Sequence, residues 1–240
     1  MKNLVRITCV VAAAVSLIAA NASATVIAEW TFETSYASIT GSSATFGGLA
    51  ADVGSGTASG LHANVSAWSA PVGDGSLKSF SVNNWSQNDY FQFTLSTAGY
   101  SGITLDWDQT SSNTGPADYV LQYSNTGTSF TQFGGDLTVI NNNAGGGNGP
   151  ARSFWSSASY ESSYHFSIDL STVSDVNNQA NVYFRIVDNG GLNPNGGVVA
   201  ASGTDRVDNF AVQGIPEPST IMLVGFGLAS CVLAIRRRRS

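Results

Sequence analysis

Short runs of alternating apolar and polar residues recur between residues 25 and 215 of this 240-residue chain. In residues 103–107, for example, Ile103, Leu105 and Trp107 fall on one side and Thr104 and Asp106 on the other. Alternation with a period of two is typical of a half-buried β-strand, whereas an amphipathic helix repeats every 3.6 residues. The pattern predicts strands over residues 26–32, 89–95, 103–107, 119–123, 164–170, 182–187 and 206–212.

The predicted strands need a second layer. Each carries about three large apolar side chains on one face, and burying such a side chain contributes roughly 1.5–3 kcal/mol. Two sheets packed face to face bury these faces, so we predict an all-β fold, a single β-sandwich of jelly-roll type.

Turn-forming residues divide the strands. Asn125, Thr126 and Gly127 predict a hairpin turn between strands at residues 119–124 and 129–133, because Asn and Gly tolerate a positive φ. Three segments rich in Gly, Ser and Asn are expected to be exposed loops: residues 41–60, 141–150 and 189–203.

The first 24 residues have the three parts of a secretory signal peptide. Lys2 and Arg6 give a positively charged start, and an apolar run follows from residue 7 to residue 20. Ala22-Ser23-Ala24 has the small-x-small form that signal peptidase cleaves, so we expect cleavage after Ala24. An uncleaved N-terminal membrane anchor is the alternative.

The C-terminus also has three parts: Pro216-Glu217-Pro218-Ser219, an uncharged apolar segment over residues 221–235, and the four arginines Arg236, Arg237, Arg238 and Arg239. As a helix, the apolar segment would be about 22 Å long at ~1.5 Å per residue, short for a bilayer core of ~30 Å, although arginine side chains can snorkel. We predict a transmembrane helix whose arginines stay in the cytoplasm, with the body on the other side of the inner membrane.

This tail resembles the PEP-CTERM sorting signal of Gram-negative bacteria that make exopolysaccharide. The resemblance rests on Pro216, Glu217, Pro218, Ser219, the apolar segment and the arginine cluster. It implies cleavage by an exosortase and delivery to the cell surface or extracellular matrix; a plain tail anchor is the alternative. The predicted organisation is therefore a signal peptide (1–24), a β-sandwich (25–214) and a sorting signal (215–240).

Charge and cysteine content narrow the function of the body. The whole chain has a net charge of −6, but six of its ten basic residues lie in the two terminal segments. Residues 25–215 keep four basic residues against fifteen carboxylates, a net charge of −11, which excludes binding to a run of phosphates such as a nucleic acid. Both cysteines, Cys9 and Cys231, lie outside the body, so it has no disulfide or thiol nucleophile.

Few residues of the body suggest catalysis. Of the two histidines, His165 falls on the polar face of its strand and is interpreted as a surface or rim residue. Asp106 and Asp108 share a strand face, and paired carboxylates on one face can cleave a glycosidic bond. Together with Glu161 they are the candidates for a polysaccharide hydrolase; a solvated polar strand face is the simpler interpretation.

Tryptophans in polar surroundings suggest sugar binding instead. Trp85 and Trp155 lie in Ser- and Asn-rich stretches with Tyr160 nearby, and Trp107 stands between two carboxylates. Trp85, Trp107 and Trp155 are therefore the candidate ligand-binding residues. The alternative is that these rings fold back and plug the ends of the sandwich.

A weaker resemblance concerns calcium. The first and last predicted strands carry Trp30-Thr31-Phe32-Glu33 and Asp208-Asn209, which resemble jelly-roll modules of the galactose-binding-like and carbohydrate-binding kind. In such modules a carboxylate from each strand often shares a structural calcium ion. The resemblance implies Glu33 and Asp208, with Asn209 as a weaker match, as calcium ligands. The alternative is that Asp208 only pins the final strand.

We therefore predict an exported, non-enzymatic protein that is a structural or carbohydrate-binding component of the exopolysaccharide layer or biofilm. Its expected partners are signal peptidase, exosortase and exopolysaccharide. A secreted polysaccharide hydrolase and a surface adhesin without sugar binding are the alternatives.

Overall fold

The fold is all-β, which confirms the fold class expected from the sequence. The computed structural model describes residues 23–35, 37, 39–142 and 154–217, and twelve strands make up most of this part of the chain. Two 3-10 helices, η2 (Ser162–Tyr164) and η3 (Ser174–Val176), flank β10. The strands are β1 (Thr25–Trp30), β2 (Gly41–Ala50), β3 (Val53–Gly54), β4 (Gly56–Ser69), β5 (Phe80–Asn83), β6 (Tyr90–Leu95), β7 (Tyr100–Ser111), β8 (Asp118–Ser124), β9 (Thr131–Thr138), β10 (His165–Asp169), β11 (Val182–Asp188) and β12 (Thr204–Pro216).

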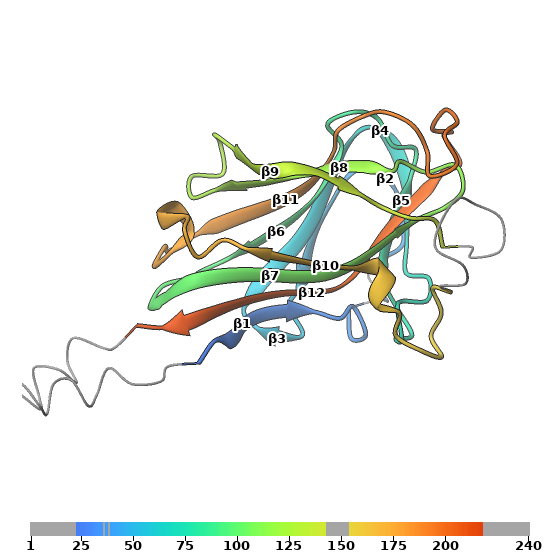
Figure 1. The fold of residues 1–240 in the computed structure, drawn as a ribbon. Coiled ribbons are helices and arrows are strands. Elements are labelled where there is room, and N and C mark those ends of the chain that lie inside the picture. The colour runs from blue at the N-terminus through green and yellow to red at the C-terminus, as the bar shows by residue number, and fades with distance from the viewer. Residues whose placement is uncertain (1–22, 36, 38, 143–153, 218–240) are drawn as a thin grey trace, which may run out of the picture.

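The strands form two layers (Figure 1). Hydrogen-bonded neighbours follow the order β10-β7-β12-β5-β4-β6-β11-β8-β9, with β1 added to β12. Phe93 of β6 nevertheless stacks on Phe210 of β12, with ring centroids 3.5 Å apart, although these strands are not neighbours in that order. Trp30 of β1 packs edge-on against both rings. The hydrogen-bonded sheet therefore bends at β5 and the long β4, so that its two halves pack face to face as a sandwich with an aromatic core.

The alternating residues are buried as the sequence pattern predicts. Leu105 and Trp107 of β7 are fully buried, whereas Asp106 between them faces outward. The predicted hairpin joins β8 and β9, and the Ser124 hydroxyl accepts hydrogen bonds from the backbone N–H groups of Thr126 and Gly127 at its turn.

Residues 41–60 are a correction: they form β2, β3 and the start of β4 rather than an exposed loop. Two of their glycines make room for tryptophan rings. A Cβ on Gly56 would lie 2.7 Å from the ring of Trp30, and a Cβ on Gly60 would lie 2.3 Å from that of Trp68. Residues 189–203 do form a loop, whereas most of 141–150 lies outside the described residues.

Both described ends of the body lie at one end of the sandwich (Figure 1). Thr25 at the start of β1 pairs with Gly214 near the end of β12. The segment with η2 and the loop over residues 189–203 lie at the opposite end. The molecule therefore has a tail end and a distal end.

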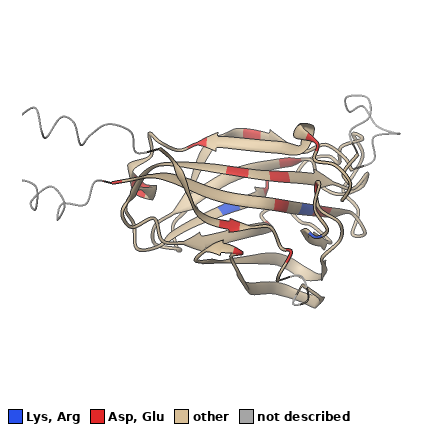
Figure 2. Cartoon of the chain, turned by 90° about the horizontal axis from the view of Figure 1, so that it is seen from below, with Lys and Arg blue, Asp and Glu red and all other residues tan. Residues whose placement is uncertain are grey.

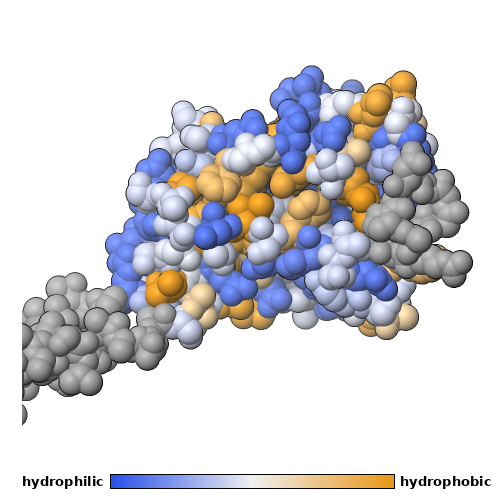
Figure 3. Space-filling view, in the orientation of Figure 1, coloured by the Kyte–Doolittle hydropathy of each residue, from blue (hydrophilic) through white to orange (hydrophobic). Residues whose placement is uncertain are grey.

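Edge strands β9 and β10 border one side of the sandwich. Partly buried apolar residues of both strands pack against the core there, and Figure 3 shows apolar surface across the middle of this side. These residues are Phe133 and Leu137 of β9 and Phe166 and Ile168 of β10. Acidic positions recur on several strands while basic ones are few (Figure 2).

Candidate functional site

Outward side chains of β7, β10 and β12 meet toward the distal end of the sandwich. His165 pairs with Asp108 in the β10–β7 register, and Asp106 lies on the same face. Nδ1 of His165 is 2.9 Å from Oδ1 of Asp108, and Nε2 is 3.5 Å from Oδ1 of Asp106. From β12, Asn209 donates to the other oxygen of Asp108 at 2.8 Å and Gln213 to that of Asp106 at 3.0 Å. The imidazole is thus held between two oriented carboxylates.

An exposed aromatic ring stands beside this histidine. Tyr160 is 52% exposed, and its ring centroid is 6.3 Å from that of His165. The side chains of His165 and Asp106 are 35% and 24% exposed, whereas that of Asp108 is 2% exposed. We call Asp106, Asp108, Tyr160 and His165 the His165 face. It combines a flat ring, an imidazole and a carboxylate that are accessible with a buried carboxylate that fixes the imidazole.

Two loops that contact each other position Tyr160. The N–H of Gly75 donates to the carbonyl of Ser156 at 2.8 Å. Gly75 has a φ of +69°, and a Cβ there would lie 2.8 Å from the backbone nitrogen of Tyr160. Only glycine therefore allows this approach of the two backbones without strain.

Buried carboxylates hold both loops against β12. Oδ2 of Asp208 accepts hydrogen bonds from the N–H of Asp74 at 3.0 Å and from the hydroxyl of Ser76 at 2.5 Å. The carboxyl of Asp74 in turn accepts the N–H of Glu161, at 3.0 and 3.1 Å. The chain Asp208–Asp74–Glu161 thus links the central strand to the residue after Tyr160.

Both of these carboxyls have raised pKa values. Burial raises the pKa of Asp74 to about 7. The hydrogen bond from the N–H of Glu161 lowers this pKa, whereas the negative charges of Asp108 and Glu161 raise it further. Burial likewise raises the pKa of Asp208 to about 7, although hydrogen bonds from Ser76, Asp74 and Asn209 oppose the shift. Near neutral pH, each carboxyl is divided between its protonated and ionised forms.

All three residues proposed for a hydrolase lie in this region, but the structure brings together only the carboxylates of Asp106 and Asp108. His165 bridges Asp106 and Asp108, while Glu161 joins through its N–H to Asp74. His165 itself, expected at a surface or rim, takes the central position. The sequence shows that these residues face outward, but not that β10 pairs with β7, which is what brings them together.

The three candidate tryptophans do not present exposed rings, which corrects the expectation that they bind a ligand. Trp85 and Trp155 are each 6% exposed and Trp107 is fully buried. Their indole N–H groups donate to Val82 O, Val72 O and the Gln109 side chain, respectively. The rings complete the core, as the alternative interpretation proposed, whereas Tyr160, next to His165, remains exposed.

Glu33 and Asp208, which were expected to hold calcium, both contact the turn over residues 74–78. Oε1 of Glu33 accepts the N–H of Lys78 at 2.8 Å, and Asp208 holds Asp74 and Ser76 of the same turn. Asn209 directs its NH₂ group to Asp108. Within the described part of the chain, no three His, Cys, Asp or Glu residues are grouped to hold a metal ion. Calcium prefers six to eight oxygen ligands, so the calcium site stays a prediction.

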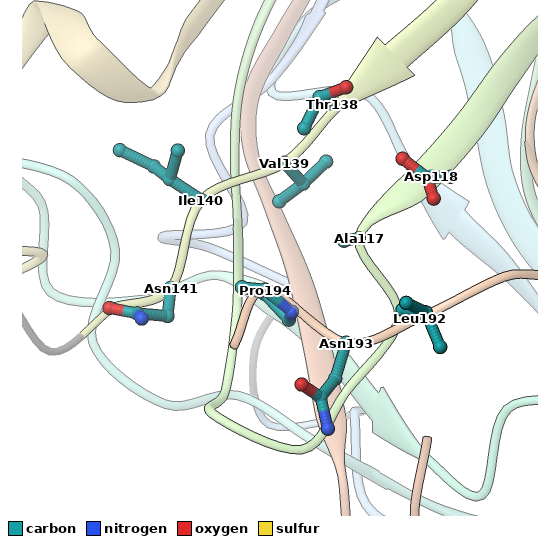
Figure 4. A pocket seen from close by; sticks show the side chains of 9 residues that line it. All are labelled: Ala117, Asp118, Thr138, Val139, Ile140, Asn141, Leu192, Asn193 and Pro194. Atoms are coloured by element: carbon teal, nitrogen blue, oxygen red, sulfur yellow. The ribbon is translucent and has the colours of Figure 1, made fainter. Parts of the chain in front are cut away.

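A pocket of about 300 Å³ also lies at the distal end. The segments 117–118 and 138–141 line it together with Leu192, Asn193 and Pro194 (Figure 4). The side-chain oxygen of Asn193 accepts two N–H groups of its own loop, from Asn195 and Gly197. The nine described lining residues include no aromatic ring, so this pocket offers fewer means to bind a sugar than the His165 face.

The processing signals are only partly described. Ala24 precedes β1, whereas Ala22 lies outside the described residues. Pro216 is the last residue of β12, two residues beyond the expected boundary at 214, and Glu217 follows. The rest of the predicted motif, helix and arginine cluster lies outside the described residues, among which no helix is long and apolar enough to cross a membrane.

Residues 214–239 match the PEP-CTERM protein-sorting motif, which confirms the resemblance found in the tail. The motif implies an exported protein that passes through a membrane-anchored intermediate and is processed by an exosortase. No curated protein is significantly similar to the chain.

Some solved structures are distantly similar. The K1 cleaved adhesin domain of the Lys-gingipain of Porphyromonas gingivalis is 14% identical over 60% of this chain and 78% of that one, with a TM-score of 0.35. A carbohydrate-binding module specific for non-crystalline cellulose, CBM28, is 14% identical over 61% and 80%, with a TM-score of 0.34. TmCBM61, in complex with β-1,4-galactotriose, is 6% identical over 57% and 70%, with a TM-score of 0.30. At TM-scores this low, the similarity supports no inference about a ligand.

Proposed function

Taking as premise that the PEP-CTERM motif makes this chain an exported exosortase substrate, we propose that its body is a non-enzymatic carbohydrate-binding component of the exopolysaccharide layer, at the cell surface or in the extracellular matrix. The His165 face is the binding site. The observation that carries the proposal is the exposed ring of Tyr160 beside an imidazole held between two carboxylates.

The chemistry of this face suits a sugar. A pyranose ring has apolar C–H faces that pack on an aromatic ring, and hydroxyl groups that donate to carboxylates. Tyr160 supplies the ring, and the partly exposed Asp106 supplies an acceptor. Because Asn209 and Gln213 already orient the two carboxylates, little side-chain freedom is lost on binding.

The position of the face supports the same function. The sorting motif begins in the last residues of β12 at the tail end, whereas His165 starts β10 directly after η2, at the distal end (Figure 1). In a membrane-anchored intermediate the face would lie on the side of the sandwich, away from its tail end. It would remain accessible to polysaccharide before and after processing.

Calorimetric titration of the processed protein with the exopolysaccharide of the producing bacterium tests the proposal. We expect saturable binding that Tyr160→Ala weakens about five- to thirtyfold, since loss of one stacking ring removes on the order of 1–2 kcal/mol. Tyr183→Ala, on the outer face of the other layer, is the matched control and should bind like the unaltered protein. A folded protein that does not bind would leave a structural or adhesive role without sugar recognition.

One observation favours a polysaccharide hydrolase as the second candidate. Glycoside hydrolysis needs a protonated carboxyl near an ionised one, and Asp74, with a pKa raised by burial to about 7, feels the charges of Asp108 and Glu161. Release of reducing ends during the same titration would support this activity. We would then expect Asp74→Asn to abolish the release while Tyr183→Ala leaves it unchanged.

A further inference from the structure

The first residues of the sorting motif belong to the folded body. In the β12–β7 register, Ile215 pairs with Ser101 and Pro216 with Tyr100. The N–H of Glu217 donates to the carbonyl of Gly99 at 2.8 Å. The matched motif starts at residue 214 and its Pro-Glu-Pro sequence starts at Pro216, so no spacer separates the sandwich from the sequence that the exosortase recognises.

The β7 side of this contact is itself braced. The N–H of Gly99 donates to the side-chain oxygen of Asn178 at 2.8 Å, and the N–H of Asn178 donates to the carbonyl of Tyr100 at 2.8 Å. Gly99 has a φ of +81°, a conformation that glycine adopts readily, and it directs its carbonyl to Glu217. The partner of Glu217 is therefore a turn that is fixed by other parts of the body.

The opposite edge of this strand end is poorly suited to pairing. β1 pairs with β12 only as far as Thr25 and Gly214, the last pair of their register. Because backbone groups of successive strand residues face opposite edges, and Glu217 donates toward β7, Pro216 faces away from β7. Proline has no N–H to donate, so it weakens that edge as a template for another strand.

We propose that exosortase cleavage requires residues 215–217 to detach from β7, so that the closed sandwich restrains its own sorting. Proteases commonly bind a substrate as an extended strand through its backbone groups. Here the backbone groups on one edge of residues 215–217 are already paired with β7. On the other edge, Pro216 has no N–H to donate to the protease. The rate of cleavage at such a site depends on the fraction of molecules in which these residues are detached, and the local stability of the fold determines that fraction.

A disulfide between positions 101 and 215 tests this proposal in the full chain. Directly opposed residues of a hydrogen-bonded antiparallel pair have Cα atoms about 5.5 Å apart, which a disulfide can bridge. We would express Ser101→Cys/Ile215→Cys in an exosortase-containing Gram-negative host, in a Cys231→Ala background, and follow processing by pulse-chase. Thiol labelling would identify the oxidised fraction. We expect that fraction to be processed at least about tenfold more slowly than either single-cysteine variant.

A second variant separates locking from misfolding or failed export. Inserting Gly-Ser-Gly-Ser between Ile215 and Pro216 moves the intact motif out of the strand but leaves the disulfide possible. We expect the oxidised double-cysteine chain with this insertion to be processed at least as fast as the unaltered protein. Two results would overturn the proposal. One is that the oxidised chain without the insertion is processed as fast as the unaltered protein; the other is that the oxidised chain with the insertion is still processed slowly.

Discussion

Nδ1 of His165 lies 2.9 Å from Oδ1 of Asp108, a carboxylate whose side chain is only 2% exposed. The contact joins β10 to β7 across the outer face of one layer. A buried acceptor that also binds Asn209 leaves the imidazole one preferred orientation. The ring next to Tyr160 is therefore positioned by the fold rather than by the ligand.

Replacing Asp108 should destabilise the body. Asp108→Ala leaves donors of Asn209 and His165 without their acceptor, and a lost buried partner costs about 1–3 kcal/mol. Asp106→Ala removes a more exposed carboxylate and should cost less than about 1 kcal/mol. Urea denaturation of the two variants measures the difference. Equal losses would contradict the structural role assigned to Asp108.

The pH dependence of stability should change when Asp208 is replaced. Burial raises the pKa of Asp208 in the folded protein to about 7, above the value of 3.8 expected on unfolding. Between these pH values the folded state retains a proton that the unfolded state has lost, so this carboxyl makes folding less favourable as pH rises from about 4 to about 7. Asp208→Asn mimics the neutral form and should gain relative stability, up to about tenfold in the unfolding constant per pH unit.

Urea denaturation at about pH 5 and about pH 8 measures this gain. Asp52→Asn is the control: although burial opposes the shift, hydrogen bonds from Thr34 and Thr31 lower the pKa of Asp52, so its effect should be constant over this range. A constant difference between Asp208→Asn and the unaltered protein would refute the expectation.

Calcium dependence separates two roles of Glu33 and Asp208. Their oxygens accept hydrogen bonds from residues 74–78, and this arrangement predicts the same Tm in EDTA and in calcium chloride. If the two carboxylates instead share a calcium ion, calcium will raise Tm and Asp208→Asn will remove the rise. Differential scanning calorimetry decides between the two outcomes.

The stacking of Phe93 on Phe210 predicts strong coupling between the layers. Phe210→Ala should lower the free energy of unfolding by about 3–5 kcal/mol, because it opens a cavity between β6 and β12. Val198→Ala changes a side chain that is 82% exposed and should change stability by less than about 0.5 kcal/mol. Chemical denaturation of both variants tests the two-layer core, and a small loss for Phe210→Ala would argue against it.

Local alternation was enough to predict the strands around Phe93, Trp107 and Ile186, because each inward face shows a period of two in the sequence. It fails over residues 41–60, where frequent glycine predicts a loop but the chain forms strands. Gly56 and Gly60 are instead strand residues that leave space for Trp30 and Trp68. A single sequence does not reveal this reason for glycine, because only the fold brings the rings of Trp30 and Trp68 against these positions.

The candidate site depended even more on long-range pairing. The sequence placed Asp106 and Asp108 on one strand face and His165 on another. Only the β10–β7 register brings the histidine between them. Likewise, polar surroundings in the sequence made Trp85 and Trp155 look exposed, although their indole N–H groups find backbone acceptors inside the body.

The most direct test of sugar binding at the His165 face uses the only two histidines of the chain. His62 is 3% exposed and hydrogen-bonded to Ser66, so it serves as an internal control. Imidazole ¹⁵N spectra of the processed protein would be recorded during titration with the exopolysaccharide. Saturable shifts of the His165 signals, with those of His62 unchanged, are the predicted result. Binding that leaves His165 unshifted, or no binding by the folded protein, would contradict the assignment of this face.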